Sequence, residues 1–571
     1  MTILCGILGR CDSGAVRRMA SAMGVRESAL HVDEGDAYAV ASADQLGKPV
    51  CVVDGSPRGR SGNRLSASAF SAHCCGLKRA RDVDVGGAFA AVVKVESGRW
   101  WLLRDRLGRK PLYYAERDGA LFFASQLKGL LASGLVPKHL NLAALDRYLT
   151  LRCVPGPESI VQGVYRVPPG HALVYDAGKI SDETFSEFDL STHDAPRDEA
   201  AEALLECLRQ SVARTDSSAV LFSGGLDSAA LTALQPRSEA LFIQLERSWQ
   251  NEARFARESA RLMKRPLRSS AARKLTEESF IRAIHALDEP LADAMAMPLW
   301  LLFEEAARHA PTVISGHGAD ELLGGFPRYH FLQKTHGAHG LIPVTLLGDI
   351  APVLPPNSFI RRGSRYLTAI HDDLRAHLSL IAVFDRGERE AMYTDVMKSA
   401  LSEPSGAEMI ARRYFTHDDL TRNLLSFDLG VGFPDLLVAK WERLAAASGL
   451  TVEMPFLDDS MVDFAAALPP QTKFGVRSKP LLRMAMKGIV PARVRLRTRR
   501  DFKFPMEGRL VQVIEGLSRQ IITRDRVEGI GVFKWPHIEQ VVRSSTHNIY
   551  RRRQFWALLM FFAWYREFME A

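Results

Sequence analysis

The chain has 571 residues, of which 47% are hydrophobic and 25% charged, and its formal net charge is +8. Its length exceeds what one hydrophobic core supports, so two domains joined by a linker are expected. The composition is that of a soluble globular protein, no apolar run approaches the roughly 20 residues that span a bilayer, and no recognition motif accompanies the positive charge, which excludes membrane and nucleic acid as expected partners.

Short β-type stretches dominate the first third of the chain. Turn residues separate them, which predicts antiparallel sheet with a few helices. The predicted strands are 38–41, 50–53, 88–95, 100–103 and 121–124. A polar, weakly patterned stretch then predicts a linker. We therefore expect a first domain over 1–180, a linker over 181–197 and a second domain over 198–571.

Helices and strands alternate in the first part of the second domain. The pattern predicts a helix ending near Arg214 and strands at 219–222, 241–245 and 311–314. Such alternation indicates a doubly wound parallel sheet that binds its ligand at the carboxyl ends of the strands. Beyond about residue 328 the pattern becomes largely helical, and the apolar run 555–565 reads as a buried terminal helix.

A glycine turn follows the first of these strands, with the sequence Ser223-Gly224-Gly225-Leu226-Asp227-Ser228. A strand, a glycine turn and a helix start direct backbone N–H groups at an anion. Because no Gly-Lys-[Ser/Thr] follows, this is not a Walker loop. A carboxylate beside phosphates is repulsive unless Mg²⁺ lies between them, so Asp227 is a candidate metal ligand. The motif resembles the pyrophosphate loop of the N-type ATP pyrophosphatases.

Two later segments also place a charged residue beside a turn or a helix start. Ser315-Gly316-His317-Gly318-Ala319-Asp320 follows the strand 311–314 and offers Asp320 as a second Mg²⁺ ligand at a helix start. Lys479, in Lys479-Pro480-Leu481-Leu482-Arg483, adds a cation just before a helical pattern.

These segments, in this order, resemble the asparagine synthetase family, which shows SGGLDS, SGxGADE, PFLD and KxxLR. The resemblance extends over nearly the whole chain through Arg104–Tyr114, Pro168–His171 and Pro455–Asp458. It implies an Ntn-hydrolase-like αββα domain of the class II glutamine amidotransferase type, followed by a PP-loop ATP-pyrophosphatase domain with a helical carboxyl-terminal part. It also implies an enzyme that adenylates a carboxylate with Mg·ATP and releases AMP and pyrophosphate.

The resemblance assigns the site residue by residue. Asp227 and Asp320 would hold Mg²⁺, and Lys479 would contact the phosphates and stabilise the intermediate. The pyrophosphate would lie on the Ser223, Gly224, Gly225 and Ser228 groups. The adenosine would be framed by Leu221, Ile243, Ser315 and Gly316.

The amino-terminal domain keeps the pattern of a glutaminase without its nucleophile. In the family an amino-terminal cysteine is the nucleophile and its own α-amine the base. Here Cys5-Gly6-Ile7 matches that opening, but removal of Met1 would expose Thr2 and leave no amine beside the thiol. The family's Asn-Gly-Glu segment stands as Asp54-Gly55-Ser56. We expect a domain that no longer releases ammonia, unless trimming exposes Cys5.

A histidine replaces the glutamate that asparagine synthetases carry in SGEGADE. An imidazole titrates near neutral pH, so His317 could take the proton that an incoming amine must lose. With an inactive glutaminase, this favours an amine that belongs to a larger substrate. Thr451 and Glu453 also replace the Glu and Arg usual in the family's acceptor segment, which counts against asparagine as the product.

Four functions remain open from these residues. We favour macrolactam closure of the lasso-peptide type, which joins an amine and a carboxylate within one peptide. The alternatives are asparagine synthesis from glutamine or ammonia, β-lactam closure of a modified amino acid, and an inactive scaffold. A precursor peptide and its leader protease are candidate partners, and the sequence leaves the oligomeric state open, a homodimer included. The absence of a secretory pattern and the odd number of cysteines predict a cytoplasmic protein.

Overall fold

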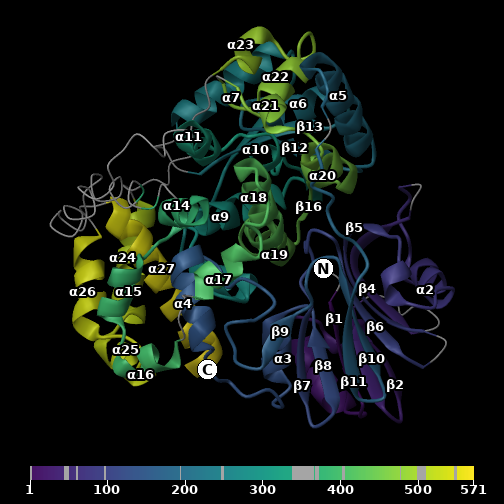
Figure 1. The fold of residues 1–571 in the computed structure, drawn as a ribbon, viewed down its shortest axis with the longest axis vertical. Helices are drawn as coiled ribbons and strands as arrows, with labels where there is room; N and C mark the ends of the chain where they lie inside the picture. The colour runs from purple at the N-terminus through teal and green to yellow at the C-terminus, as the bar shows by residue number, and fades with distance from the viewer. Residues whose placement is uncertain are drawn as a thin grey trace.

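The computed structural model describes residues 3–43, 50–59, 62–95, 98–192, 194–245, 250–336, 366, 369, 372–401, 406–475, 477–497, 509–545 and 549–570. Three parts are visible in Figure 1: stacked sheets at lower right, a sheet covered by helices at the top, and a helical bundle at lower left. The predicted order of an antiparallel domain, a parallel sheet and a helical carboxyl-terminal part is confirmed.

Two antiparallel sheets form the amino-terminal domain. The first has the order β2-β3-β1-β8-β7-β9 and comprises β1 (Leu4–Leu8), β2 (His31–Gly35), β3 (Tyr38–Ser42), β7 (Tyr113–Arg117), β8 (Ala120–Ala124) and β9 (Val164–Arg166). The second has the order β11-β10-β6-β5-β4 and comprises β4 (Cys51–Arg58), β5 (Gly86–Lys94), β6 (Trp100–Arg104), β10 (His171–Asp176) and β11 (Lys179–Thr184). Leu8, Leu102 and Phe123 belong to the apolar layer that joins them.

Helices cover the outer faces of both sheets. The first sheet carries α1 (Ser13–Ala22) and α3 (Leu127–Ala132), and the second carries α2 (Ala67–Cys75). Each of the five strands predicted in this region is present, so the αββα expectation is confirmed. By contrast, α4 (Leu142–Leu151) packs against α14 (Asp373–Ile381) and α17 (Gly406–Arg412). Figure 1 shows it beside the carboxyl-terminal helices.

A parallel sheet of five strands forms the base of the second domain. Its order is β14-β13-β12-β15-β16, with β12 (Ala219–Leu221), β13 (Glu239–Gln244), β14 (Leu267–Ala271), β15 (Thr312–Ile314) and β16 (Thr451–Glu453). The sheet is packed by α6 (Leu226–Leu234), α7 (Gln250–Leu262) and α9 (Ala296–Ala306), and α5 (Arg197–Ala213) leads into it. Since all five strands are parallel, their carboxyl ends share one edge, where the glycine turns lie.

One helical run crosses the second domain without a break. It comprises α18 (Leu420–Phe427), a π-helical segment (Asp428–Leu437) and α19 (Val438–Ala447). π-Helical turns bond i to i+5 and are frequent at functional sites. Pro434 lies inside this one, where an α-helix would lose a hydrogen bond.

The remaining helices complete the second domain. They are α8 (Glu277–Leu287), α10 (Ala319–Leu322), α11 (Pro327–His336), α15 (Arg386–Met392), α16 (Asp395–Ala400), α20 (Asp459–Ala466), α21 (Pro470–Lys473), α22 (Pro480–Ala485), α23 (Ala492–Arg495), α24 (Arg509–Ile521), α25 (Arg524–Ile530), α26 (Trp535–Ser544) and α27 (Ile549–Tyr565). Apart from Tyr565, the predicted terminal helix is buried from Phe555 onward. Within the described ranges no helix is both long and apolar enough to cross a bilayer.

A buried ion cluster ties the two domains together. Glu442 on α19 accepts hydrogen bonds from Arg109 at 2.7 Å and from Lys110 at 3.0 Å, and all three side chains are largely shielded from solvent. Tyr113 donates to Glu289 at 2.6 Å nearby. The segment Arg104–Tyr114, which carries part of the family resemblance, therefore forms part of the interface between the domains.

Candidate active site

The first glycine turn lies at the carboxyl end of β12. Gly224 has φ +77°, a conformation that favours glycine, and a Cβ there would lie 2.8 Å from Ala256 Cα in α7. Its carbonyl accepts a hydrogen bond from Ser259 at 2.9 Å, which fixes the turn against that helix. Ser223 and Gly225 are exposed and α6 begins directly after them, so the turn presents a helix start to a ligand.

The second turn packs directly on the first. Gly316 leaves no room for a side chain, because a Cβ would lie 2.9 Å from Asp227 Cβ. Gly318, at φ +97°, then starts the short helix α10, which places Asp320 and Glu321 in its first turn. The two aspartates that were predicted as metal ligands are thereby brought to one place.

Lys479 joins these two carboxylates. Its Nζ lies 2.5 Å from Asp227 Oδ2 and 2.7 Å from Asp320 Oδ1, and the side chain is only 6% exposed. Burial alone would lower the pKa of Lys479, but the two carboxylates outweigh it and raise that pKa. Lys479 also adopts a left-handed backbone conformation, φ +53°, at the start of α22. Strain of this kind is concentrated at functional sites.

The donor set suits Mg²⁺. Two carboxylates that converge on one cation supply hard oxygen ligands, and Mg²⁺ is commonly bound by one or two carboxylates together with substrate phosphates. In the described part of the chain no group of three His, Cys, Asp or Glu side chains could hold a metal by itself. A magnesium ion would therefore be held by Asp227 and Asp320 and would be completed by the nucleotide.

The residues expected around adenosine share the same edge. Leu221 ends β12, Ile243 lies near the end of the neighbouring β13, and Ser315 follows β15. Ser315 is fixed by a hydrogen bond from its N–H to the Glu453 carbonyl at 2.9 Å. These residues and Gly316 occupy the position where doubly wound sheets bind nucleotides.

His317 stacks on an aromatic side chain. Its ring lies 4.7 Å from that of Trp441 on α19, with an interplanar angle of 22°. Burial, helped by the Lys440 ammonium, lowers the pKa of His317 to about 3. The expectation that this imidazole titrates near neutral pH is therefore wrong for the structure as it stands, because desolvation disfavours the imidazolium. A role as base remains a prediction.

Known protein families match this chain in sequence. A model of the asparagine synthase family matches residues 199–566, which is well over half of the chain. The chain belongs to the asparagine synthase family. A model of the glutamine amidotransferase domain matches residues 76–186. The chain is thus an ATP-dependent ligase of asparagine-synthetase type.

Relatives of this chain include asparagine synthetases and a β-lactam synthase. Asparagine synthetase [glutamine-hydrolyzing] 1 of Bacillus subtilis (strain 168) is 24% identical over 81% of this chain and 74% of its own length. A putative asparagine synthetase [glutamine-hydrolyzing] of Mycobacterium bovis is 28% identical over 82% and 74%. Carboxyethyl-arginine beta-lactam-synthase of Streptomyces clavuligerus is 27% identical over 57% and 63%.

Cys5 is enclosed in this member of the asparagine synthase family. It lies inside β1, between Ala41 of β3 and Ala124 of β8, and it is 0% exposed. Burial raises the pKa of its thiol to about 12, so the thiolate is scarce at neutral pH. These surroundings suit a packed apolar residue better than a nucleophile.

The acceptor-like segment of the asparagine synthase family lines a different space. A cleft of about 620 Å³ opens between the domains, with Gly55 and Gly87 on one side and Thr451 and Glu453 on the other. The Glu453 carboxylate accepts a hydrogen bond from Ser217 at 2.5 Å. The two departures noted in the sequence thus face the interdomain cleft.

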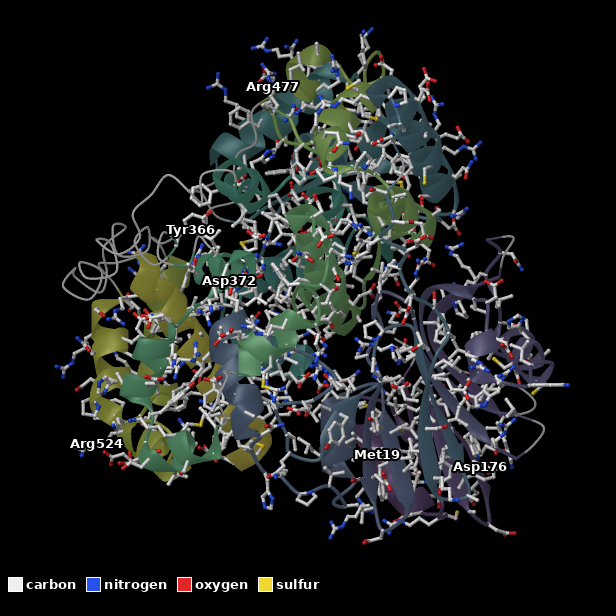
Figure 2. All side chains as sticks on the ribbon, viewed as in Figure 1. Met19, Asp176, Tyr366, Asp372, Arg477 and Arg524 are labelled. Carbon is white, nitrogen blue, oxygen red and sulfur yellow. The ribbon has the colours of Figure 1, made fainter. Side chains whose placement is uncertain are left out.

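The arginine cluster near residue 495 is largely engaged within the protein. Arg493 and Arg497 reach Glu258, and Arg495 donates to the Arg483 carbonyl at 2.8 Å. Arg477, labelled at the top of Figure 2, donates to the Leu496 carbonyl at 3.1 Å. Arg499 and Arg500 lie outside the described residues. This cluster therefore closes α22 and α23 onto α7.

Sequence reasoning missed several charged groups at the site. Glu321 is buried, and burial together with Asp320 raises its pKa to about 7. Asp293 and Lys440 form an ion pair close to His317; burial acts in the opposite direction, yet Lys440 and Arg152 lower the pKa of Asp293 to about 2. Glu321 could have been found as the last letter of the ADE motif. Asp293 and Lys440 lie in no glycine turn, and no sequence motif marks them as residues of the site.

Proposed function

We propose that this ligase adenylates a carboxylate with Mg·ATP and couples it to an amine that belongs to a larger substrate, most specifically to close a macrolactam of the lasso-peptide type. A carboxylate oxygen bonds to the α-phosphorus while the bond to the bridging oxygen breaks and pyrophosphate leaves. The amine then bonds to the acyl carbon, AMP leaves, and one proton is lost from nitrogen. The observation that carries this proposal is the convergence of Lys479 with Asp227 and Asp320.

The charges at the site support the first step. Negative charge develops on the phosphoryl oxygens and on the departing pyrophosphate, and preorganised donors at that place lower the barrier. Lys479 holds a fixed positive charge there, and the first glycine turn offers a helix start. When bound, Mg²⁺ would neutralise the phosphates and orient them.

The state of the amino-terminal domain supports the second step. Because Cys5 is enclosed, ammonia from glutamine has no evident source in this chain, and the amine must come from another molecule or another part of the substrate. A scaffold without activity would not need two carboxylates and a lysine at one point, so that alternative is disfavoured.

Asparagine synthesis is the second candidate, since most of the relatives above are described as asparagine synthetases. It requires glutamine-derived or free ammonia. Mass spectrometry of the mature amino terminus separates the candidates: a chain that begins at Cys5 would restore the glutaminase and favour this second function. β-Lactam closure is tested with the same assay and a modified amino acid as the substrate.

Replacement of Lys479 tests the site itself. We expect Lys479→Met to lower pyrophosphate release with candidate peptides by about 10²-fold or more, because a charge aimed at the developing negative charge is lost. Asp227→Asn should also lower pyrophosphate release. Lys487→Met, at an exposed position on the same segment, is the matched control and should release pyrophosphate like the wild type. Undiminished release by Lys479→Met would refute the assignment.

Replacement of His317 separates the two steps. If the imidazole assists the amine, His317→Ala should slow amide formation about 10²-fold and leave ATP–pyrophosphate exchange nearly unchanged. Trp441→Phe, which keeps an aromatic partner for the ring, should retain both activities. Equal losses in both steps of His317→Ala would assign the residue to packing alone.

A further inference from the structure

A segment rich in arginine is tied together by its own side chains. Residues 477–497, here called the arginine segment, contain α22 and α23. Near its start, Arg477 donates a hydrogen bond to the Leu496 carbonyl at 3.1 Å. Arg483 and Arg495 each donate from the guanidinium to the backbone carbonyl of the other. The two ends of the segment are therefore held side by side.

One end of the arginine segment supplies the lysine of the candidate site. Arg483 is only 7% exposed, and its Nε donates to the Ser478 carbonyl at 2.8 Å. This bond fixes the backbone directly before Lys479, whose own φ is +53°. The ammonium of Lys479 then reaches Asp227 and Asp320. The arginine segment thus contacts the site directly through its lysine.

The other end of the arginine segment reaches the first glycine turn through a serine. The guanidinium carbon of Arg497 lies 4.7 Å from the centroid of the Phe255 ring, and Arg497 Nη1 donates to Ser259 Oγ at 3.1 Å. Ser259 is 0% exposed, and its hydroxyl donates in turn to the Gly224 carbonyl at 2.9 Å. Figure 1 shows α7, which carries Phe255 and Ser259, together with α22 and α23 at the top of the second domain. One segment therefore acts on both sides of the site.

The bond from Ser259 sets the orientation of one peptide unit in the turn. In a trans peptide the C=O and the N–H point in opposite directions, so a Gly224 carbonyl directed into α7 leaves the Gly225 N–H on the exposed side. Both residues are glycine, and the φ of −78° at Gly225 could change sign at little steric cost, which would turn the unit over. A carbonyl would then face the phosphates in place of an N–H and would repel their oxygens.

We propose that Arg497 is a positioning residue of the adenylation reaction. Through Ser259 it keeps the N–H of the Gly224–Gly225 peptide directed at the pyrophosphate, and the arginine segment links this orientation to Lys479. The inference rests on the proposed function, because it places the outer phosphates of ATP on the first glycine turn. An arginine that only packed α23 against α7 would affect every ligand of the site alike.

Nucleotide binding tests this role without knowledge of the acceptor substrate. Isothermal titration of the full chain with Mg·ATP and with AMP compares a ligand that reaches the first glycine turn with one that lacks both outer phosphates. We expect Arg497→Met to bind Mg·ATP about tenfold more weakly than the wild type, because a hydrogen bond to a charged phosphate is lost, and to bind AMP equally well. Arg497→Lys keeps the charge without the planar fork, so its affinity for Mg·ATP should lie between those of the wild type and Arg497→Met.

Replacement of the serine tests the connection separately. Ser259→Ala leaves Arg497 in place and removes the hydroxyl, so it should weaken Mg·ATP binding to a similar extent and spare AMP. The losses should not add in the double variant, because both side chains act through one chain of hydrogen bonds. Arg493→Met is the matched control: Arg493 also pairs with Glu258, at 3.1 Å, but its side chain is 72% exposed. It should bind both nucleotides like the wild type.

The outcomes separate this inference from the proposed function. Equal weakening of Mg·ATP and AMP binding in Arg497→Met, with a lowered Tm, would assign the residue to packing and overturn the inference. Unchanged Mg·ATP binding by Arg497→Met or by Ser259→Ala would also overturn it, while a wild-type preference for Mg·ATP over AMP would leave the proposed function intact. If the wild type binds Mg·ATP no more tightly than AMP, the proposed function itself fails.

Discussion

Glu321 makes the stability of the site depend on pH. Its pKa rises from 4.5 to about 7 because the carboxyl is buried beside Asp320. The folded protein thus binds a proton at this residue that the unfolded chain releases above about pH 4.5. Its contribution is most favourable below that pH and is lost as the pH rises toward 7.

Glu321→Gln should remove this dependence. The amide mimics the protonated acid, so the variant should be more stable than the wild type at pH 8, by up to about 3 kcal/mol, and equal to it near pH 4.5. Urea unfolding at several pH values measures the difference. Glu278→Gln, which changes an exposed acid, is the control, and its difference in unfolding free energy from the wild type should not vary with pH. If the unfolding free energies of Glu321→Gln and wild type vary with pH in parallel, Glu321 is not the source of the dependence.

The residues that converge at the candidate site were singled out from the sequence because each lies in a local motif. Asp227 and Asp320 follow glycine turns, and Lys479 precedes a helix, so their chemistry can be read without the fold. The pKa of His317 could not be predicted, because burial and the Lys440 charge arise from distant parts of the chain.

At the scale of elements, the first glycine turn depends on α7. We expect Gly224→Ala to destabilise the protein by about 3 kcal/mol, because the new Cβ combines a positive φ with contacts to the α7 backbone that cannot yield. The Tm and the affinity for ATP should both fall. Gly516→Ala, in an open and exposed part of α24, should instead raise stability by roughly 0.5–1 kcal/mol. Similar Tm changes in the two variants would contradict this account.

The strand predictions were confirmed where the apolar pattern in the sequence is long. The strands 88–95, apolar except for Lys94, and 219–222 carry long apolar runs and lie close to their predicted bounds. By contrast, β14 reads Leu-Arg-Ser-Ser-Ala and β16 has three residues, so both strands owe their existence to pairing with β13 and β15. Pairing between distant segments leaves no local pattern.

At the scale of the molecule, a buried ion cluster joins the amino-terminal domain to the second domain. Glu442→Ala should lower the free energy of unfolding by about 3–5 kcal/mol, because Arg109 and Lys110 would lose their buried partner. Differential scanning calorimetry should still show one transition, at a lower temperature, if the domains unfold together. Glu442→Gln keeps the shape of the side chain, so its free energy of unfolding should lie between those of the wild type and Glu442→Ala. A Tm equal to that of the wild type would show that the interface is held elsewhere.

The π-helical segment Asp428–Leu437 sets the rotation of the following helix, α19, about its axis. Removal of one residue there would let the wide turns revert to ordinary α-helix and turn α19 by about 100° about its axis. Trp441 would then leave the ring of His317, and Glu442 would swing away from Arg109. The π-helical segment thus fixes the rotation of α19. That rotation places Trp441 against His317 and Glu442 against Arg109 at the domain interface.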